Sequence, residues 1–296
     1  MVIVIMGFLS QGAAYRYAAE ERGRERKAQM DKRVVIMGAR GSVPVSGKQF
    51  EKYGCATTSV LVRLCGRSIV IDAGSGILAL PGLLGPDEKR AELLLSHAHA
   101  DHLIGLGMCP ALMRADFRLD IYGAARGGMS VRRQIGRLLS PPLWPVGTDE
   151  LPADVRYHTL KESFSLGGVA VESTQGVHSG GVSVFRISGD GVSIVYAGDT
   201  NLTEEHYRSL AEFAEGCDLL LCDGQYSDEE WKKRGSFGHS GYLAAARLGR
   251  DAGAKRVRIV HHDPFRTDSE LDAAAEEVRR ICGSADMARE GEEILL

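Results

Sequence analysis

Short apolar runs alternate with glycine-rich breaks from about residue 33 onward, which is typical of β-strands joined by tight turns. Gly66-Arg67-Ser68 forms a hairpin turn between two such runs, so we expect those strands to pair antiparallel. Helical patterns separate the later runs. The first half of the chain predicts strands at 33–37, 58–65, 68–71, 91–95 and 117–122, and helices at 77–84 and 103–114.

The second half repeats this order, with glycine-rich hairpin turns at 167–168 and 189–191. Two runs of strands, each followed by helices, predict an α/β chain with two mixed sheets face to face and helices outside. The strands are expected at 155–158, 164–166, 169–173, 182–187, 193–197, 219–222 and 257–260, and the helices at 202–214, 240–252 and 269–281, the last of which would close the chain.

Residues 124–150 interrupt the pattern, because they lack strand periodicity. The segment from Met129 to Leu139 is amphipathic and basic, and a proline-rich break at 141–145 follows it. Such an insert could cover a functional site or form a plain surface excursion, and the sequence favours neither.

Composition narrows the class of protein. The chain has 296 residues, 44% of them hydrophobic, and a net charge of −3, so no broad basic surface for bulk nucleic-acid binding is expected. Its six cysteines form no Cys-x-x-Cys pair, which indicates buried, reduced thiols in a cytoplasmic protein. No run approaches the ~20 apolar residues of a membrane span. We expect residues 1–32 to be a peripheral extension and residues 33–296 to form a single domain.

The densest chemistry lies in Ser96-His97-Ala98-His99-Ala100-Asp101-His102, directly after the apolar run at 91–95. His97 and His99 are two positions apart and are expected to point the same way, whereas Asp101 and His102 turn to the other side. Imidazole and carboxylate groups are preferred ligands of zinc and similar divalent ions. The spacing therefore predicts two metal ions.

Further candidate ligands follow other predicted strands, namely His178, Asp199 and His261. His262 would face away from its neighbour along an extended chain, and the spacing from His239 favours His261 as the ligand. His239 precedes a helix at the expected rim of the cleft, where it could donate a proton.

In this order the candidate ligands resemble the metallo-β-lactamase superfamily, over about residues 33–285. Gly238-His239-Ser240, with the alanine-rich helix and strand after it, is similar to the ribonuclease Z and phosphodiesterase branch. The segments 38–44, 53–59 and 71–76 are similar to small bacterial hydrolases near the phosphoribosyl cyclic phosphodiesterases. The resemblance implies a four-layer αβ/βα sandwich with a two-metal site on one edge.

The resemblance also implies roles for the residues. One metal would take His97, His99 and His178, the other Asp101, His102 and His261, and Asp199 would bridge them. The ions would be zinc, with manganese or iron as alternatives. A hydroxide between them would attack phosphorus, with Asp101 and His239 as the catalytic residues and His239 protonating the leaving oxygen.

The expected substrate is a small anionic phosphodiester, cyclic ones included, because no long glycine- and lysine-rich arm for gripping transfer RNA is present. Asp72 is expected to support the metal loops, and Arg40 or an arginine at 132–137 to hold a phosphate oxygen. Ribonuclease Z-like RNA processing, thioester or lactone hydrolysis, and a metal-stabilised ligand sensor stay open, as does a homodimer.

Overall fold

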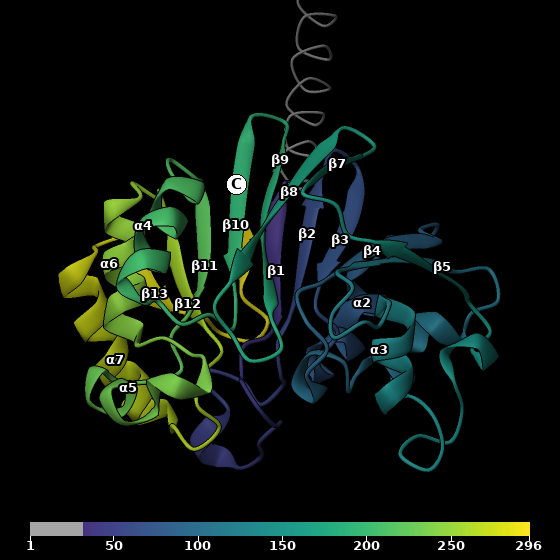
Figure 1. Ribbon diagram of the computed structural model, residues 1–296, viewed down its shortest axis with the longest axis horizontal. Helices are drawn as coiled ribbons and strands as arrows, with labels where there is room; N and C mark the ends of the chain where they lie inside the picture. The colour runs from purple at the N-terminus through teal and green to yellow at the C-terminus, as the bar shows by residue number, and fades with distance from the viewer. Residues whose placement is uncertain (1–31) are drawn as a thin grey trace, which may run out of the picture.

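Two β-sheets pack face to face, with helices covering the outer face of each (Figure 1). The computed structural model describes residues 32–296, so the prediction made for residues 1–32 lies outside the described residues, apart from Lys32. This arrangement confirms the predicted α/β sandwich of mixed sheets.

The first sheet has the strand order β14-β1-β2-β3-β4-β5-β6. Antiparallel pairing joins β14, β1, β2 and β3, as the hairpin at Gly66 predicts, and parallel pairing continues from β3 to β6. Its strands are β1 (Arg33–Gly38), β2 (Ser59–Leu64), β3 (Arg67–Ile71), β4 (Arg90–Leu95), β5 (Arg118–Gly123), β6 (Asp154–Thr159) and β14 (Glu293–Leu295).

The second sheet has the order β13-β12-β11-β10-β9-β8-β7 and the same division into an antiparallel and a parallel half. The two glycine-containing hairpin turns predicted here connect β7 to β8 and β9 to β10. The strands are β7 (Ser163–Leu166), β8 (Val169–Gly176), β9 (Val182–Gly189), β10 (Val192–Ala197), β11 (Leu219–Asp223), β12 (Val257–Val260) and β13 (Ala285–Met287).

Alternate residues of a central strand pack into two different hydrophobic cores, one between the sheets and one under the outer helices. In β11, Leu219 and Leu221 face the core between the sheets, whereas Leu220 and Cys222 pack under the outer helices. A strand buried on both faces needs apolar residues at every position, which explains its continuous apolar sequence. The outer helices are α2 (Leu80–Leu83) and α3 (Val131–Leu138) on the first sheet, and α4 (Glu204–Phe213), α5 (Asp228–Arg234), α6 (Tyr242–Asp251) and α7 (Asp268–Ile281) on the second.

The helix predicted at 103–114 is wrong. Short 3-10 turns occupy Leu106–Met108 and Pro110–Met113 instead. Gly105 donates its N–H to Ala73 O, and a Cβ on Gly105 would lie 2.1 Å from Gly74 O, so the segment is pressed onto the loop after β3. This close approach, and Pro110 without an N–H, prevent a regular helix.

One short α-helix and two short strands of the described chain were not predicted. Helix α5 begins at a capping box made by Ser227 and Glu230, a sequence signal that could have revealed it. Strands β13 and β14 have only three residues each, and they follow α7, so the prediction that this helix closes the chain is wrong.

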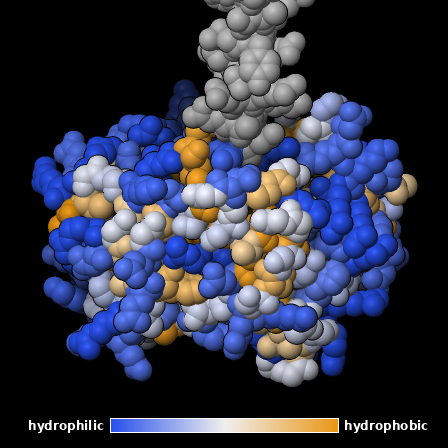
Figure 2. Space-filling model, turned by 90° about the horizontal axis from the view of Figure 1, so that it is seen from above, coloured by the Kyte–Doolittle hydropathy of each residue, from blue (hydrophilic) through white to orange (hydrophobic). Residues whose placement is uncertain are grey.

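The molecular surface offers few broad apolar areas on the side turned toward the viewer in Figure 2, where apolar residues lie in small groups among hydrophilic ones. Among residues 32–296, no helix combines the length and the apolar character that crossing a bilayer requires.

A buried carboxylate fastens the two sheets together. Asp72, which follows β3, accepts a hydrogen bond of 2.9 Å from the hydroxyl of Tyr196 in β10 of the opposite sheet. It also accepts the backbone N–H of Ser96 (2.7 Å) and its hydroxyl (2.7 Å). Asp72 is fully buried, with φ at +58°, so the chain holds it in a left-handed conformation that these bonds stabilise. These contacts confirm that Asp72 supports the loop at 96–102.

Replacing Tyr196 with Phe removes the hydroxyl that reaches Asp72 and leaves a buried carboxylate with one donor fewer. We expect the free energy of unfolding to fall by about 1–3 kcal/mol, measured by urea denaturation. Tyr207→Phe is the control, since its hydroxyl bonds the exposed Asp251 and its loss should cost no more than about 0.5 kcal/mol. Equal effects of the two substitutions would contradict the fastening role of Asp72.

Candidate metal centre

Loops at the ends of four strands meet at one edge of the sandwich. His97 to His102 follow β4, His178 follows β8, Asp199 follows β10 and His261 follows β12. Asp199 and His261 have φ of +42° and +61°, in the left-handed region that non-glycine residues seldom adopt. Such a conformation turns the chain sharply off the strand, and it directs both side chains toward the loop at 96–102.

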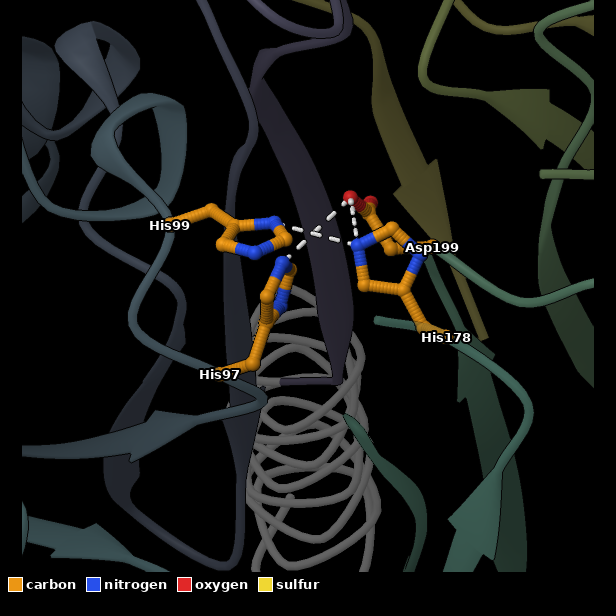
Figure 3. A group of neighbouring side chains, drawn as sticks. All are labelled: His97, His99, His178 and Asp199. Carbon is orange, nitrogen blue, oxygen red and sulfur yellow. Dashed lines mark hydrogen bonds and ion pairs between the residues drawn. The ribbon is translucent and has the colours of Figure 1, made fainter. Parts of the chain in front are cut away.

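The first group of side chains consists of His97, His99, His178 and Asp199, whose ligand atoms all lie within 4.8 Å of one another. Figure 3 shows the three imidazoles and the carboxylate converging from different loops. Asp199 Oδ2 is 3.5 Å from His97 Nε2 and 3.9 Å from His178 Nε2, and His178 Nε2 is 3.0 Å from His99 Nδ1. The nitrogen and oxygen atoms of these four side chains therefore surround a space that one metal ion could occupy.

The second group consists of Asp101, His102, Asp199 and His261, and all four are buried. His261 Nε2 lies 3.1 Å from Asp101 Oδ2 and 3.1 Å from Asp199 Oδ1. His102 Nε2 lies 3.1 Å from Asp199 Oδ2. Asp199 belongs to both groups, so the two sets of donors share one carboxylate.

Four of the five imidazoles are fixed through the ring nitrogen that faces away from the groups. His97 Nδ1 is 3.0 Å from Ser96 Oγ, and His102 Nδ1 is 2.8 Å from Asp72 Oδ2. Similarly, His178 Nδ1 bonds Gly238 O at 2.9 Å, and His261 Nδ1 bonds Gln225 Oε1 at 3.1 Å. Such bonds set the tautomer and orientation of metal-binding histidines, so these residues fit a cation in both groups.

Polar atoms inside the groups lack hydrogen-bond partners. His97 Nε2, His102 Nε2 and Asp199 Oδ1 are buried and make no hydrogen bond in the described structure, although His102 Nε2 and His261 Nε2 each lie 3.1 Å from an oxygen of Asp199. A buried polar atom without a partner costs about 1–3 kcal/mol. The donor set is nitrogen and oxygen, as divalent zinc, manganese and iron prefer, so the residues present fit a pair of such ions.

The protonation of the two groups differs. Burial, together with neighbouring imidazoles, lowers the pKa of His97 and of His178, so these rings are neutral at pH 7. Burial alone would lower the pKa of His261, but the carboxylates of Asp199, Asp101 and Asp223 together outweigh it and raise the pKa to about 9. Burial would raise the pKa of Asp199, but His102 and His261 hold it well below its ordinary value. Protons on these rings therefore offset the buried carboxylates wherever no cation does so.

His239 lies beside the second group rather than in it. It is 8% exposed, and its ring stacks on that of His261 at a centroid distance of 4.8 Å. Its Nδ1 is 2.9 Å from Oδ2 of the buried Asp223, which also accepts the backbone N–H of Thr200. Because Asp223 occupies Nδ1, Nε2 is the nitrogen free to carry a transferable proton.

Two further residues considered in the sequence analysis, His262 and Arg40, lie buried outside the two groups. His262 is fully buried and its Nε2 bonds Ala288 O, so it faces away from the two groups as predicted. The reason differs from the prediction, because β12 ends at Val260 and His261 is left-handed rather than extended. The expectation that Arg40 holds a phosphate oxygen is wrong, because its guanidinium is fully buried and donates to the backbone carbonyls of Gly54, Asp263 and Arg266.

Three supporting residues were missed by sequence reasoning. Gln225 orients His261, and Ser42 donates its N–H to Asp101 Oδ2 at 2.7 Å. Arg126 lies near His97, at the start of the insert. Only Arg126 carries a sequence signal, since two glycines follow it directly and make a tight turn that fixes its position.

The insert after β5 forms one wall of a hollow beside the first group. The hollow has a volume of about 320 Å³, and His97 and His99 line its floor. Its walls come from the loop at 179–181 and from insert residues, namely Arg126, Met129, Gln134 and Arg137. The segment 126–137 is therefore a structural part of the site.

Two known proteins are similar to this chain in sequence over most of its length. The chain is 24% identical over 309 residues to the ribonuclease Z of Treponema pallidum (strain Nichols), which covers 88% of this chain and 96% of that protein. It is 23% identical over 279 residues to the probable metallo-hydrolase YhfI of Bacillus subtilis, which covers 88% of this chain and 98% of that protein.

Solved structures share the fold. The crystal structure of the metallo-β-lactamase fold protein YhfI from Bacillus subtilis superposes with a TM-score of 0.69 at 20% identity, covering 88% of this chain and 98% of that one. Human tRNase Z, short form, superposes with a TM-score of 0.62 at 18% identity, covering 88% and 98%. The family model described as the β-lactamase superfamily domain matches residues 67–262, more than half of the sequence. The chain therefore belongs to the metallo-β-lactamase superfamily of hydrolases.

Proposed function

We propose that this hydrolase binds two divalent metal ions and cleaves a small phosphodiester. The observation that supports this most strongly is the pair of four-residue groups that share Asp199, with buried, unpaired nitrogen and oxygen atoms inside them. His97, His99 and His178 would hold one ion, Asp101, His102 and His261 the other, and Asp199 both. When bound, such a pair supplies Lewis acidity and lowers the pKa of water toward about 7.

The chain's own residues complete the reaction. Ser42 N–H and the neighbouring imidazoles keep the Asp101 carboxylate in place, and Asp72 does the same for His102. His239 would donate a proton from Nε2 to the leaving oxygen, while Asp223 at Nδ1 holds the ring in the orientation that transfer requires. Hydrolysis of a thioester or lactone depends on this proton donor less than hydrolysis of an alkyl phosphodiester does. The leaving group of a thioester or lactone departs from a tetrahedral intermediate, which expels it more readily. The buried Asp223–His239 pair therefore favours a phosphodiester.

RNA processing is the second candidate. Ribonuclease Z proteins at 24–25% identity cover 83–90% of the chain, which favours RNA as a phosphodiester substrate. The net charge of −3 favours a small substrate instead, since gripping an extended RNA relies on many cationic contacts. Incubation with a transfer RNA precursor carrying a 3′ trailer separates the two, because only ribonuclease Z-like activity releases the trailer.

The shared position of Asp199 generates a prediction about metal content. Purified protein should contain about two divalent ions per chain by inductively coupled plasma mass spectrometry. Asp199→Asn should lower this to fewer than one and abolish hydrolysis of bis-p-nitrophenyl phosphate, because it removes the carboxylate common to both groups. Asp149→Asn, at an exposed residue paired with Arg132, is the control and should retain both ions. Two ions bound to the Asp199 variant would refute the shared ligand.

A second prediction concerns His239. His239→Ala should leave the metal content unchanged and should slow hydrolysis of an alkyl phosphodiester by roughly 100-fold or more, because its poor leaving group needs a proton. Hydrolysis of bis-p-nitrophenyl phosphate should slow by less than about 10-fold, because p-nitrophenolate leaves unprotonated.

His158→Ala is the matched control for this variant, since His158 bonds Asp120 on the first sheet, away from the two groups. It should hydrolyse both substrates at the wild-type rate. A His239→Ala variant that keeps the full rate on the alkyl diester would show that the proton comes from elsewhere.

A further inference from the structure

The hollow beside the first group contains a guanidinium that no acidic side chain neutralises. Arg126 forms no ion pair within 4.0 Å among the described residues, and neither does Arg137, which lines the same hollow. Burial lowers the pKa of Arg126, and no carboxylate offsets that cost. The other two arginines of the insert do not place a free charge in the hollow. Arg132 pairs with Asp149, and Arg133 does not line the hollow.

The position of Arg126 is built into the fold. Arg126 and Met129 exchange two backbone hydrogen bonds, of 3.0 and 2.9 Å, around Gly127 and Gly128, whose φ angles are +54° and +72°. This is a two-residue hairpin turn that needs glycine at both central positions. The turn holds the start of the arginine side chain in one place.

The guanidinium itself is held at one nitrogen only. Its Nη2 donates to Ser96 O at 3.2 Å and to Ser183 Oγ at 2.7 Å, which anchors it next to the residue before His97. Its Nη1 has only a long contact of 3.5 Å with Gln175 Oε1. A Cβ on Gly181 would lie 2.4 Å from Nη1, so the glycine makes the space that the guanidinium fills. Donors at Nη1 and Nε thus stay available on a fixed, half-buried cation.

We propose that Arg126, with Arg137 beside it, binds a second anionic group of the substrate, an oxyanion of the phosphate or carboxylate kind, while the phosphodiester lies on the metal centre. This proposal rests on the proposed function. A planar, preorganised guanidinium suits bidentate recognition of such groups, and the hollow of about 320 Å³ has room for one small substituent. The preferred substrate is therefore a phosphodiester with another negative charge on the side of His97 and His99.

Matched substrates test this subsite. Adenosine 2′,3′-cyclic phosphate is compared with the same compound carrying a 5′-phosphate and with its 5′-carboxylate analogue. The wild-type kcat/KM should be roughly 10- to 100-fold higher for at least one of the two substrates with the added anion, since charged hydrogen bonds are worth that much. The larger gain of the two identifies the anion that the hollow accepts. A gain below twofold for both would overturn the proposal.

Variants assign the gain to Arg126. In Arg126→Gln the ratio of kcat/KM with and without the added anion should fall to about one. Arg126→Lys, which keeps the charge but loses the fork, should retain a small part of it. Arg133→Gln removes the same charge from an exposed position of the same insert and should keep the wild-type ratio. An unchanged ratio in both Arg126 variants would overturn the assignment.

A binding measurement provides an independent readout. Calorimetric titration with adenosine 5′-phosphate should give a Kd about 10-fold weaker for Arg126→Gln than for wild type, and unchanged for Arg133→Gln. Equal Kd values for wild type and Arg126→Gln would contradict the subsite. If the metal-loaded protein cleaves none of the three cyclic substrates, the proposed function fails. If it cleaves all three equally, only the subsite fails.

Discussion

Asp199 is the constraint on which the site depends, because its carboxylate is buried where the two sheets meet and cannot stay there without positive charge nearby. Imidazoles approach it from both sheets, with His97 and His102 on the loop after β4 and His178 and His261 on loops after β8 and β12. In the proposed function, this carboxylate would be the ligand common to both cations. The loops after β4, β8 and β12 all place imidazoles around this one group.

The precision of that arrangement comes from a layer of hydrogen bonds behind the imidazoles. Asp72, Gly238 and Gln225 hold the far ring nitrogens of His102, His178 and His261. Asp72 also bonds Tyr196 of the opposite sheet, so the same group that orients His102 fastens the sandwich. Site geometry and the packing of the two sheets are consequently coupled, and damage to one should appear in the other.

Sequence reasoning predicted many strands because segments such as Leu93–Leu95 in β4 and Leu219–Cys222 in β11 are continuous and apolar, as a strand buried on both faces requires. It also predicted which histidines would gather, since His97, His178 and His261 each follow a predicted strand. It failed at 103–114, where the approach of Gly105 to Gly74 is a tertiary contact that helical propensity does not contain. It failed for Gln225 and Ser42, because contacts between residues distant in sequence leave no local pattern.

Anomalous diffraction at the zinc absorption edge, from crystals grown with zinc, tests the central claim most directly. The account predicts two peaks roughly 3.5–4 Å apart, one beside His97, His99 and His178 and the other beside His102 and His261, with Asp199 between them. A single peak, or two peaks that Asp199 does not join, would contradict it.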